Sequence, residues 1–350
     1  MAAEMDAAVL HGVKDLRLEK VPEPRGPAGP DDVLIAMRSV GLCGSDVHYW
    51  QEGRIGSFVV TQPMILGHEC SGQVVEVGAN VRDLKPGDRV AIEPGIPCRV
   101  CTYCTTGRYN LCVNMRFFAT PPDDGALAQY VSHPAALSYK LPENVDYEEA
   151  AMLEPFSVGL YATRRAGVAP GKSVLILGAG PVGLLCLLAA QAAGAMRIYV
   201  ADIKDDRLAV ASRLGAAGTF RADDPEIGER LREETEDLGP EIVLECSGAP
   251  SAVRQSVDLA RPGGTVVWIG MGPASFEFPT LTVGIKELDV KGMFRYRHTW
   301  PTAIELVSSG KVDVKPLVTH RFGLPQVLDA FELTRTAADG AIKVMVNLEG

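Results

Sequence analysis

Four cysteines fall within fifteen residues of the chain, in the pattern Cys98-x2-Cys101-x2-Cys104-x7-Cys112. Four thiolates are the donor set with which Zn²⁺ forms closed tetrahedral sites, and such sites are structural rather than catalytic. The alternative is four free buried thiols, which such dense spacing disfavours. A zinc-finger DNA reader would need a basic helix nearby, and the surrounding sequence has none. The spacing therefore predicts a structural zinc site.

A second group of metal-ligand residue types is spread along the chain. Cys43 lies in GLCGSDVH, His68 in the triplet Gly67-His68-Glu69, and Glu154 in MLEPFSVG. A catalytic zinc takes about three protein ligands and keeps one position open, and thiolate, imidazole and carboxylate are suitable donors. Spacing alone does not bring these residues together. Considered alone, His68 could equally be a hydrogen-bonded histidine of the core, and Cys43 could be a small apolar residue.

A glycine-rich turn, Gly178-Ala-Gly180-Pro-Val-Gly183, follows the apolar segment VLIL and precedes an apolar, helix-like stretch. In a dinucleotide-binding turn the first glycine permits the bend, the second lets the backbone approach a pyrophosphate, and the third allows the helix to pack on the strand. The helix N-terminus then offers free N–H groups to the phosphates. The alternative is a glycine-rich turn without a ligand.

An acid at the end of the next strand-like segment supports the dinucleotide interpretation. Asp202 lies 19 residues after Gly183. Its carboxylate can accept hydrogen bonds from both ribose hydroxyls and repels a 2′-phosphate, so it favours NAD over NADP. Arg207 is expected either to line the adenosine or to lie on the surface of the following helix.

Two differently built parts of the chain must position these motifs. Residues 5–150 contain many short β segments separated by turn-forming stretches such as PRGPAGPDD and KPGD. From residue 173 strands and helices alternate, which is the pattern of a doubly wound parallel sheet. Helices are expected to start near residues 181, 204 and 251, and strands are expected near residues 174–177, 197–201, 241–245 and 264–269.

The alternation stops after about residue 290. One helix is expected in TWPTAIELVSSG, and strands are expected in KPLVTHRF and AIKVMVNL. The length of 350 residues suits two domains. The predicted boundaries are a β-rich domain at 1–155, a nucleotide-binding domain at 156–290, and a return of the chain to the first domain at 291–350.

Composition and charge exclude several classes of protein. Hydrophobic residues make up 47% and charged residues 22%, an ordinary globular composition. The net charge of -10 disfavours nucleic acid or an anionic membrane surface as a partner. Residues 173–196 carry no charge, yet their glycines divide them into a strand and a helix instead of one membrane span. Without a signal-peptide pattern, the eight cysteines are expected to be reduced and the protein cytoplasmic.

The triplet at residues 67–69 begins a longer signature, GHE-x2-G-x5-G-x2-V. This signature resembles that of the zinc-containing alcohol dehydrogenases, in the medium-chain dehydrogenase superfamily. Within the superfamily, the whole chain is most similar to the polyol dehydrogenases that act on sorbitol (L-iditol), xylitol or L-arabinitol. The segments that carry this similarity include HYWQEGRIGSFVV, FFATPPDDGALAQYV, MLEPFSVGLYA and KGMFRYRHTWP.

The resemblance implies an α/β protein with a GroES-like β-rich catalytic domain, to which residues 291–350 return, and a Rossmann cofactor domain. It also implies NAD as the cofactor, with one catalytic and one structural Zn²⁺ per chain. The expected partner is a small-molecule polyol, and neither nucleic acid nor a membrane is expected. A homotetramer is implied by family analogy, with a dimer as the alternative.

The same resemblance implies roles for particular residues. Cys43, His68 and Glu69 would hold the catalytic zinc together with a water. Simple alcohol dehydrogenases have a cysteine at the position of Glu154, so the glutamate is typical of the polyol branch; it either contacts zinc or holds the water. Carboxylate in place of thiolate would leave the zinc a stronger Lewis acid.

Further positions match the proton relay, the polyol pocket and the cofactor site. Ser45 and His48 match the relay between the substrate oxygen and solvent, and for His48 a surface position is the alternative. Arg295 can hydrogen-bond the hydroxyls of the substrate, face the cofactor phosphates, or do both. Besides Ser45 and Glu154, the implied polyol pocket comprises Tyr49, Ile55, Phe58, Phe117, Arg295 and Tyr296. The implied cofactor contacts are Gly178, Gly180, Pro181, Val182, Gly183, Asp202, Arg207, Ile269, Gly270, Met271, Met293, Phe294 and Arg295.

The expected reaction oxidises a secondary hydroxyl of a polyol to the ketose, with hydride transfer to NAD. The proton would leave through Ser45 or the water that Glu154 holds. One rival is a zinc- and NAD-dependent dehydrogenase of another small alcohol, such as threonine or a butanediol. A second rival is a non-catalytic nucleotide-binding protein of the same fold, which would be expected to lack Cys43, His68 or Glu69.

Overall fold

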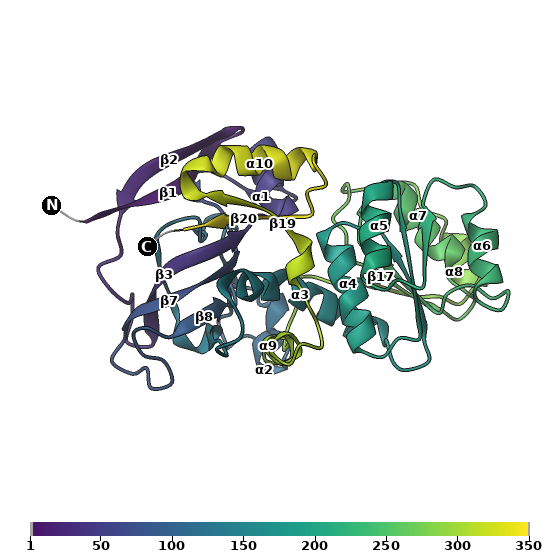
Figure 1. The fold of residues 1–350 in the computed structure, drawn as a ribbon, viewed down its shortest axis with the longest axis horizontal. Helices are drawn as coiled ribbons and strands as arrows, with labels where there is room; N and C mark the ends of the chain where they lie inside the picture. Colours follow the sequence, from purple (N-terminus) through teal and green to yellow (C-terminus); the bar gives the residue numbers. More distant parts are fainter. Residues whose placement is uncertain (1–2, 349–350) are drawn as a thin grey trace. The chain divides into compact units, whose positions relative to one another are not determined.

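The computed structural model describes residues 3–348 and divides the chain into two compact units (Figure 1). The β-rich unit comprises the chain up to Glu154 and from Trp300 onward, and the nucleotide unit is Pro155–Thr299. The predicted boundaries follow residues 155 and 290. The second boundary differs because β18 (Asp289–Gly292) still pairs with β17 (Thr265–Trp268) in the sheet of the nucleotide unit.

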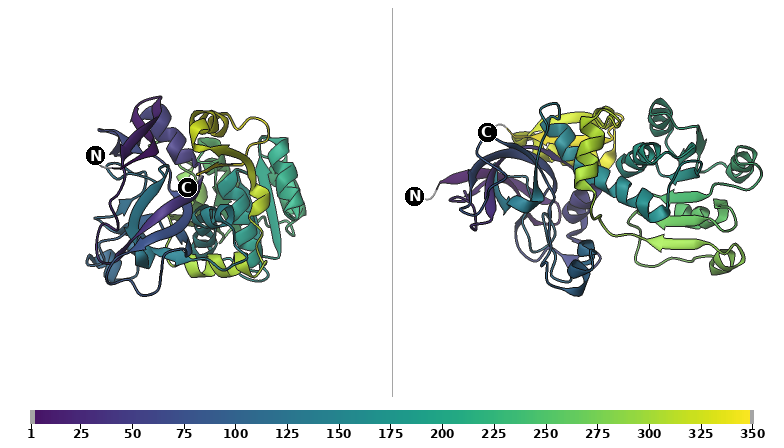
Figure 2. Two further views of the ribbon diagram at one scale, coloured as in Figure 1. Left: turned by 60° about the vertical axis from the view of Figure 1, so that its left-hand side comes forward. Right: turned by 90° about the horizontal axis from the view of Figure 1, so that it is seen from below.

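A seven-stranded sheet forms the core of the β-rich unit. Strands β12, β8, β7, β3, β20 and β19 follow one another, and β11 pairs with β3. Residues 33–37 of β3 are all buried, so both faces of this central strand are covered. Strand β20 from the C-terminal part pairs antiparallel with β3 and places Met345 opposite Gly41. The chain thus returns to its first unit, as Figure 2 also shows.

The elements of the β-rich unit have the following bounds. Its strands are β1 (Glu4–Gly12), β2 (Asp15–Pro22), β3 (Asp32–Gly41), β4 (Arg54–Ile55), β5 (Phe58–Val59), β6 (Met64–Ile65), β7 (Glu69–Val77), β8 (Arg89–Ile92), β9 (Gly95–Ile96), β10 (Arg116–Phe117), β11 (Tyr130–Pro134), β12 (Ser138–Lys140), β19 (Val318–Gly323) and β20 (Lys343–Asn347). Its helices are α1 (Gly44–Glu52), α2 (Thr102–Thr105), α9 (Trp300–Ser308) and α10 (Val327–Thr336), and α3 (Tyr147–Ala166) runs from this unit into the next.

The nucleotide unit is a six-stranded parallel sheet in the order β15-β14-β13-β16-β17-β18. This is the strand order of a Rossmann fold, so the predicted fold class is confirmed. Helix α4 packs on β13 and β14, α5 on β14 and β15, and α7 on β16 and β17. The remaining bounds are β13 (Ser173–Leu177), α4 (Pro181–Ala192), β14 (Arg197–Asp202), α5 (Asp205–Arg213), β15 (Gly218–Arg221), α6 (Ile227–Glu233), β16 (Ile242–Glu245), α7 (Pro250–Leu259) and α8 (Thr280–Ile285).

The uncharged stretch at residues 173–196 forms β13, the glycine turn and α4, as the glycines predict. Helix α4 has twelve residues, too few to cross a bilayer. In the part of the chain that the structure describes, no helix is both long and apolar enough for a membrane span.

Candidate metal centres and dinucleotide-binding turn

The register between β3 and β7 brings the first group of metal-ligand residues together. Cys43 caps the N-terminus of α1, two residues after β3 ends. Glu69 is the first residue of β7, and His68 directly precedes it. The two strands are antiparallel, with Gly41 opposite Glu69. One ligand atom from each of Cys43, His68 and Glu69 lies within 4.8 Å of the others, and His68 and Glu69 are buried.

This donor set fits a zinc ion. Zinc binds sulfur, nitrogen and oxygen ligands at about 2.0–2.3 Å, so two ligands of one ion are separated by at most about twice that length. The ligand atoms of Cys43, His68 and Glu69 lie within 4.8 Å of one another, which is close to this limit. Three protein ligands leave a fourth position for water or substrate, which is the arrangement of catalytic zinc sites.

A buried carboxylate that the sequence interpretation missed supports this group. Asp46 accepts hydrogen bonds from the backbone N–H of Cys43 and of Gly67, both at 3.0 Å, and its Oδ1 lies 3.6 Å from His68 Nδ1. Burial raises the pKa of Asp46, but the charge of His68 and the two N–H donors outweigh this and hold it below its ordinary value. With Nδ1 directed at Asp46, the His68 ring can present Nε2 to a metal.

Asp46 also acts on His68. Burial lowers the pKa of His68, yet the Asp46 carboxylate raises it well above its ordinary value. The position of Asp46 at the third residue of α1, where its side chain caps the helix through Cys43, is the sequence feature that could have identified it.

A lysine from the C-terminal part of the chain completes the surroundings of Glu69. Lys343 is 2% exposed, and its Nζ lies 2.6 Å from both carboxylate oxygens of Glu69 and 3.1 Å from the carbonyl oxygen of Leu42. Burial lowers the pKa of Lys343, but the Glu69, Cys43 and Glu154 charges outweigh it and raise the pKa. A positive charge is therefore fixed beside the candidate ligands.

Glu154 lies in α3 and is 5% exposed. It does not belong to the group of three candidate ligands found among the described residues. It is near enough to act on Cys70: burial raises the pKa of that thiol well above its ordinary value, and Glu154 and then Glu69 raise it further. Glu154 is therefore a buried carboxylate that acts on the surroundings of Glu69 and Cys70 without belonging to that group.

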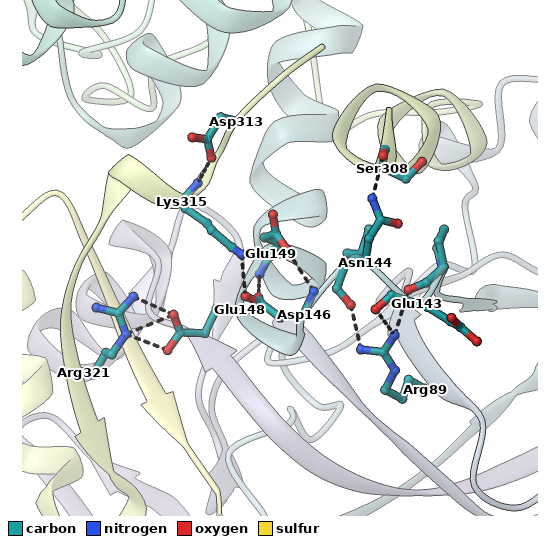
Figure 3. Close-up of polar contacts among 12 residues, drawn as sticks. Arg89, Glu143, Asn144, Asp146, Glu148, Glu149, Ser308, Asp313, Lys315 and Arg321 are labelled. Atoms are coloured by element: carbon teal, nitrogen blue, oxygen red, sulfur yellow. Dashed lines mark hydrogen bonds and ion pairs between the residues drawn. The ribbon is translucent and has the colours of Figure 1, made fainter. Parts of the chain in front are cut away.

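Polar contacts fix the helix that carries Glu154 at its N-terminal end (Figure 3). Glu148 accepts two parallel hydrogen bonds from Arg321, at 2.7 and 2.8 Å, and a third from Asn347. Lys315 pairs with Asp146 at 3.0 Å. The C-terminal part of the chain thus anchors the first turn of α3, two turns before Glu154.

The predicted relay and pocket residues of the β-rich unit differ in burial. Ser45 is half-buried in the first turn of α1, whereas His48 is exposed and lies 3.6 Å from Glu52, as expected for a surface histidine. Tyr49 and Phe117 are buried, Ile55 is half-buried and Phe58 is 39% exposed. The Phe117 ring lies 5.8 Å from that of His68, so Phe117 borders the candidate metal site.

The four-cysteine segment forms a second compact group. The sulfur atoms of Cys101 and Cys104 are 3.5 Å apart, and those of Cys98 and Cys104 are 4.0 Å apart. The sulfur atoms of these three residues and of Cys112 all lie within 4.8 Å of one another, which fits one tetrahedral zinc. Backbone N–H donors, that of Cys104 first, lower the pKa of Cys101 to about 6. Burial and the neighbouring thiols raise the pKa of Cys104 to about 12.

The glycine turn lies between β13 and α4, as predicted. Gly178 has φ +98°, in the left-handed region that favours glycine. A Cβ atom on Gly183 would lie 1.8 Å from the carbonyl oxygen of Gly178, so a side chain there would force the turn apart. A Cβ atom on Gly180 would lie 3.0 Å from Nη1 of Arg207, which places Arg207 beside the turn, with Pro181 and Val182 opening α4.

The remaining predicted cofactor residues follow strands of the parallel sheet. Asp202 ends β14, where its oxygens accept hydrogen bonds from the N–H groups of Ala179 at 2.6 Å and Lys204 at 2.9 Å. Its carboxylate keeps further acceptor capacity for ribose hydroxyls. The carboxyl ends of parallel strands form the ligand-binding edge of such sheets. Ile269, Gly270 and Met271 follow β17, and Met293, Phe294, Arg295 and Tyr296 follow β18.

Comparison with known proteins supports the same assignment over nearly the whole chain. Residues 29–143 match the alcohol dehydrogenase GroES-like domain, and residues 181–309 match the zinc-binding dehydrogenase family. Sorbitol dehydrogenase of Gallus gallus is 48% identical over 347 residues, which cover 98% of this chain and 96% of the relative.

Solved structures extend the comparison to the fold. An Escherichia coli oxidoreductase/dehydrogenase of unknown specificity superposes with a TM-score of 0.94 at 39% identity, covering 99% of this chain and 100% of the other. 2R,3R-butanediol dehydrogenase of Bacillus subtilis has a TM-score of 0.89 at 32% identity, covering 98% and 99%. The chain therefore belongs to the zinc-binding medium-chain dehydrogenases, on the branch of the sorbitol dehydrogenases.

Proposed function

We propose that the protein oxidises a secondary hydroxyl of a sugar alcohol, of the sorbitol, xylitol or L-arabinitol type, to the ketose with NAD as hydride acceptor. The observation that carries the proposal is the convergence of Cys43, His68 and Glu69 in a chain 48% identical to a sorbitol dehydrogenase. A non-catalytic protein of this fold would have no reason to keep the three ligand types together.

Cys43, His68 and Glu69 would hold the catalytic zinc, and Cys98, Cys101, Cys104 and Cys112 the structural one. When bound, zinc supplies Lewis-acid polarisation of the substrate hydroxyl, and NAD supplies the hydride acceptor. Asp46 orients the His68 ring through Nδ1, and Lys343 neutralises the Glu69 carboxylate. These two residues prepare the site before substrate arrives.

Proton removal falls to Ser45 and Glu154. Glu154 is a buried carboxylate close to Cys70 and Lys343, so it can hold a water that takes the proton of the hydroxyl. Ser45, half-buried in α1, offers a hydroxyl for the next step of the relay. His48 would receive the proton only as a solvent-exposed final acceptor.

Polar side chains would give the preference for polyols over simple alcohols. Arg295 and Tyr296 would hydrogen-bond the hydroxyls further along the substrate, and Tyr49 and Phe117 would supply apolar walls. A site that pairs with substrate hydroxyls rejects analogues without them far better than an apolar slot does. Asp202 would select NAD by accepting the ribose hydroxyls.

The proposal extends to assembly and compartment. Leu281 and Ile285 on α8 are 74% and 75% exposed, an apolar surface that a second copy could cover in a homotetramer or a dimer. None of the eight cysteines, which all lie in the described part of the chain, forms a disulfide, and this supports a reducing, cytoplasmic setting. Light scattering of the purified protein would measure the assembly directly.

Substrate-dependent NAD reduction by the purified, zinc-loaded enzyme tests the proposal. The panel comprises sorbitol, xylitol, L-arabinitol, threonine, 2,3-butanediol and ethanol. A higher kcat/KM for at least one of the first three is expected. Activity confined to the last three would keep the dehydrogenase assignment and remove the roles given to Arg295 and Tyr296, and the variant Arg295→Ala should lower kcat/KM for polyols more than for ethanol.

A further inference from the structure

A cavity of about 420 Å³ in the nucleotide unit gathers positive charge that the proposed reaction does not use. It is lined by Tyr161, Arg164, Arg165, Lys291, Arg297 and His298. The residues come from the C-terminal end of α3, from β18 and from the segment after β18, and all belong to Pro155–Thr299. Four cationic side chains around one cavity stand out in a chain whose net charge is -10.

Backbone carbonyls and an aromatic ring hold these cations in place. Arg164 donates a hydrogen bond to the carbonyl oxygen of His298 at 2.5 Å, and Arg165 donates one to Gly292 at 3.0 Å. The Arg297 guanidinium lies over the Tyr161 ring, 5.6 Å from its centroid. The arginines are thus oriented by contacts that leave their charge intact.

Two of the four cations have no carboxylate partner in the described part of the chain. Among the described residues, neither Arg165 nor Arg297 forms an ion pair, and Lys291 lies 3.6 Å from Asp289, whose side chain is 74% exposed. The Nε of Arg165 is buried and has no hydrogen-bond partner in the same part of the chain. A buried donor without an acceptor costs stability, and the protein itself leaves one guanidinium N–H of Arg165 unpaired at this cavity.

We propose that this cavity binds a phosphate-bearing small molecule. The planar guanidinium group matches the geometry of phosphate oxygens and pairs with them through two parallel hydrogen bonds. The volume falls within the range of about 300–1,000 Å³ that is typical of small-molecule sites, so it has room for an organic body beside the phosphate group. The Tyr161 ring lines the cavity and holds the Arg297 guanidinium at its edge.

The site is separate from the glycine turn at Gly178–Gly183, where the cofactor phosphates are expected. It is adjacent in sequence to the proposed substrate residues, because Arg297 and His298 directly follow Tyr296. A ligand that bridges α3 and Arg297 would hold the segment that carries Arg295 and Tyr296. This effect on substrate binding depends on the proposed function, whereas the binding of phosphate does not.

Isothermal titration calorimetry of the full-length, zinc-loaded enzyme with saturating NAD tests the binding site. The cofactor keeps the titrant from the glycine turn, and sodium chloride holds the ionic strength constant. Inorganic phosphate and glucose 6-phosphate are titrated separately, with glucose as the uncharged control. Tighter binding of glucose 6-phosphate assigns the site to an organic phosphate, and equal binding assigns it to the phosphate group alone; both results support the proposal.

Arg297→Gln and Lys291→Gln should each weaken the binding at least threefold, and the double variant at least tenfold. Arg213→Gln is the matched control, because Arg213 is exposed at the end of α5 and its loss changes the net charge equally. The melting temperature of each variant checks that it is folded. Undetectable binding of both phosphates to the wild-type enzyme would overturn the proposal, as would equal weakening in Arg213→Gln.

The KM for sorbitol, measured with and without the phosphate that binds, tests the consequence for the substrate. A change in KM that the double variant abolishes would link the cavity to residues 295–296. An unchanged KM alongside confirmed binding would overturn that link and leave the binding site standing. Loss of sorbitol oxidation altogether would instead count against the proposed function.

Discussion

The buried ion pair between Lys343 and Glu69 predicts a large loss of stability when the amine is removed. The two residues are 2% and 1% exposed, and Nζ lies 2.6 Å from both carboxylate oxygens. Lys343→Met keeps an unbranched side chain and removes the charge with its donors. Since water cannot replace the amine, the variant is expected to lose about 3–5 kcal/mol, the cost of breaking a buried pair by removing one partner.

Differential scanning calorimetry measures this loss. At roughly 2–4 °C per kcal/mol for a domain of this size, the melting temperature should fall by about 6–20 °C. Lys20→Met is the matched control, because Lys20 pairs with Asp6 at 2.9 Å on the surface. Exposed pairs contribute about 0–1 kcal/mol. Adding Glu69→Gln to Lys343→Met should recover part of the loss, since the uncompensated charge disappears.

The same scans on zinc-loaded and chelator-treated protein test the metal site. If Glu69 contributes to it, zinc supplies the positive charge that Lys343→Met removes, so the fall in melting temperature becomes smaller in the loaded protein. An equal fall with and without zinc would remove Glu69 from the proposed ligand set. A fall no larger than that of Lys20→Met in the chelated protein would refute the conclusion that Lys343 neutralises Glu69.

Asp46→Asn should lower the zinc affinity of the first site about 10–100-fold, measured by competition with a chelator, because the His68 ring loses its orienting carboxylate; unchanged affinity would exclude that role. Cys101→Ser should lower the melting temperature more than kcat per folded enzyme, and the reverse would make the four-cysteine segment catalytic. Asp202→Ala should reduce the ratio of kcat/KM for NAD to that for NADP, and a constant ratio would remove its assigned role. Burial lowers the pKa of His133 to about 4. The unfolded chain therefore binds a proton on His133 at a higher pH than the folded protein does. The free energy of unfolding should fall by up to about 3 kcal/mol as the pH is lowered from 6.5 towards 4. In His133→Asn the melting temperature should lose this part of its pH dependence.

Local sequence patterns were sufficient for much of the nucleotide unit. The four predicted strands and three predicted helix starts correspond to elements from β13 to β17, because a buried parallel strand and an apolar helix carry their signal within a few residues. The glycine turn could also be predicted from the sequence, because the steric constraints that require Gly178 and Gly183 act within six residues.

The elements that escaped prediction have weaker local signals. Strands β15 and β18 are the two edges of the parallel sheet, have four residues each, and are half-buried or exposed, so they lack an apolar run. Helix α3 contains Pro155 in its interior, a residue that normally interrupts a helix. Its twenty residues are maintained by packing of a buried face and by the contacts at its first turn.

In the candidate site, the sequence identified the metal-ligand residues but not the charged residues around them. A motif marks Cys43, His68 and Glu69, so they could be predicted. The charged residues that lie beside His68 and Glu69 could not. Asp46 has the local mark of a helix-capping acid, whereas Lys343 lies 274 positions from Glu69 and reaches it only because β20 pairs with β3. A lysine in the run KVMVN otherwise resembles the polar end of a strand. The charge beside the proposed zinc ligands is therefore a property of strand pairing, which explains why the return of the C-terminal residues to the β-rich unit matters for the chemistry as well as for the fold.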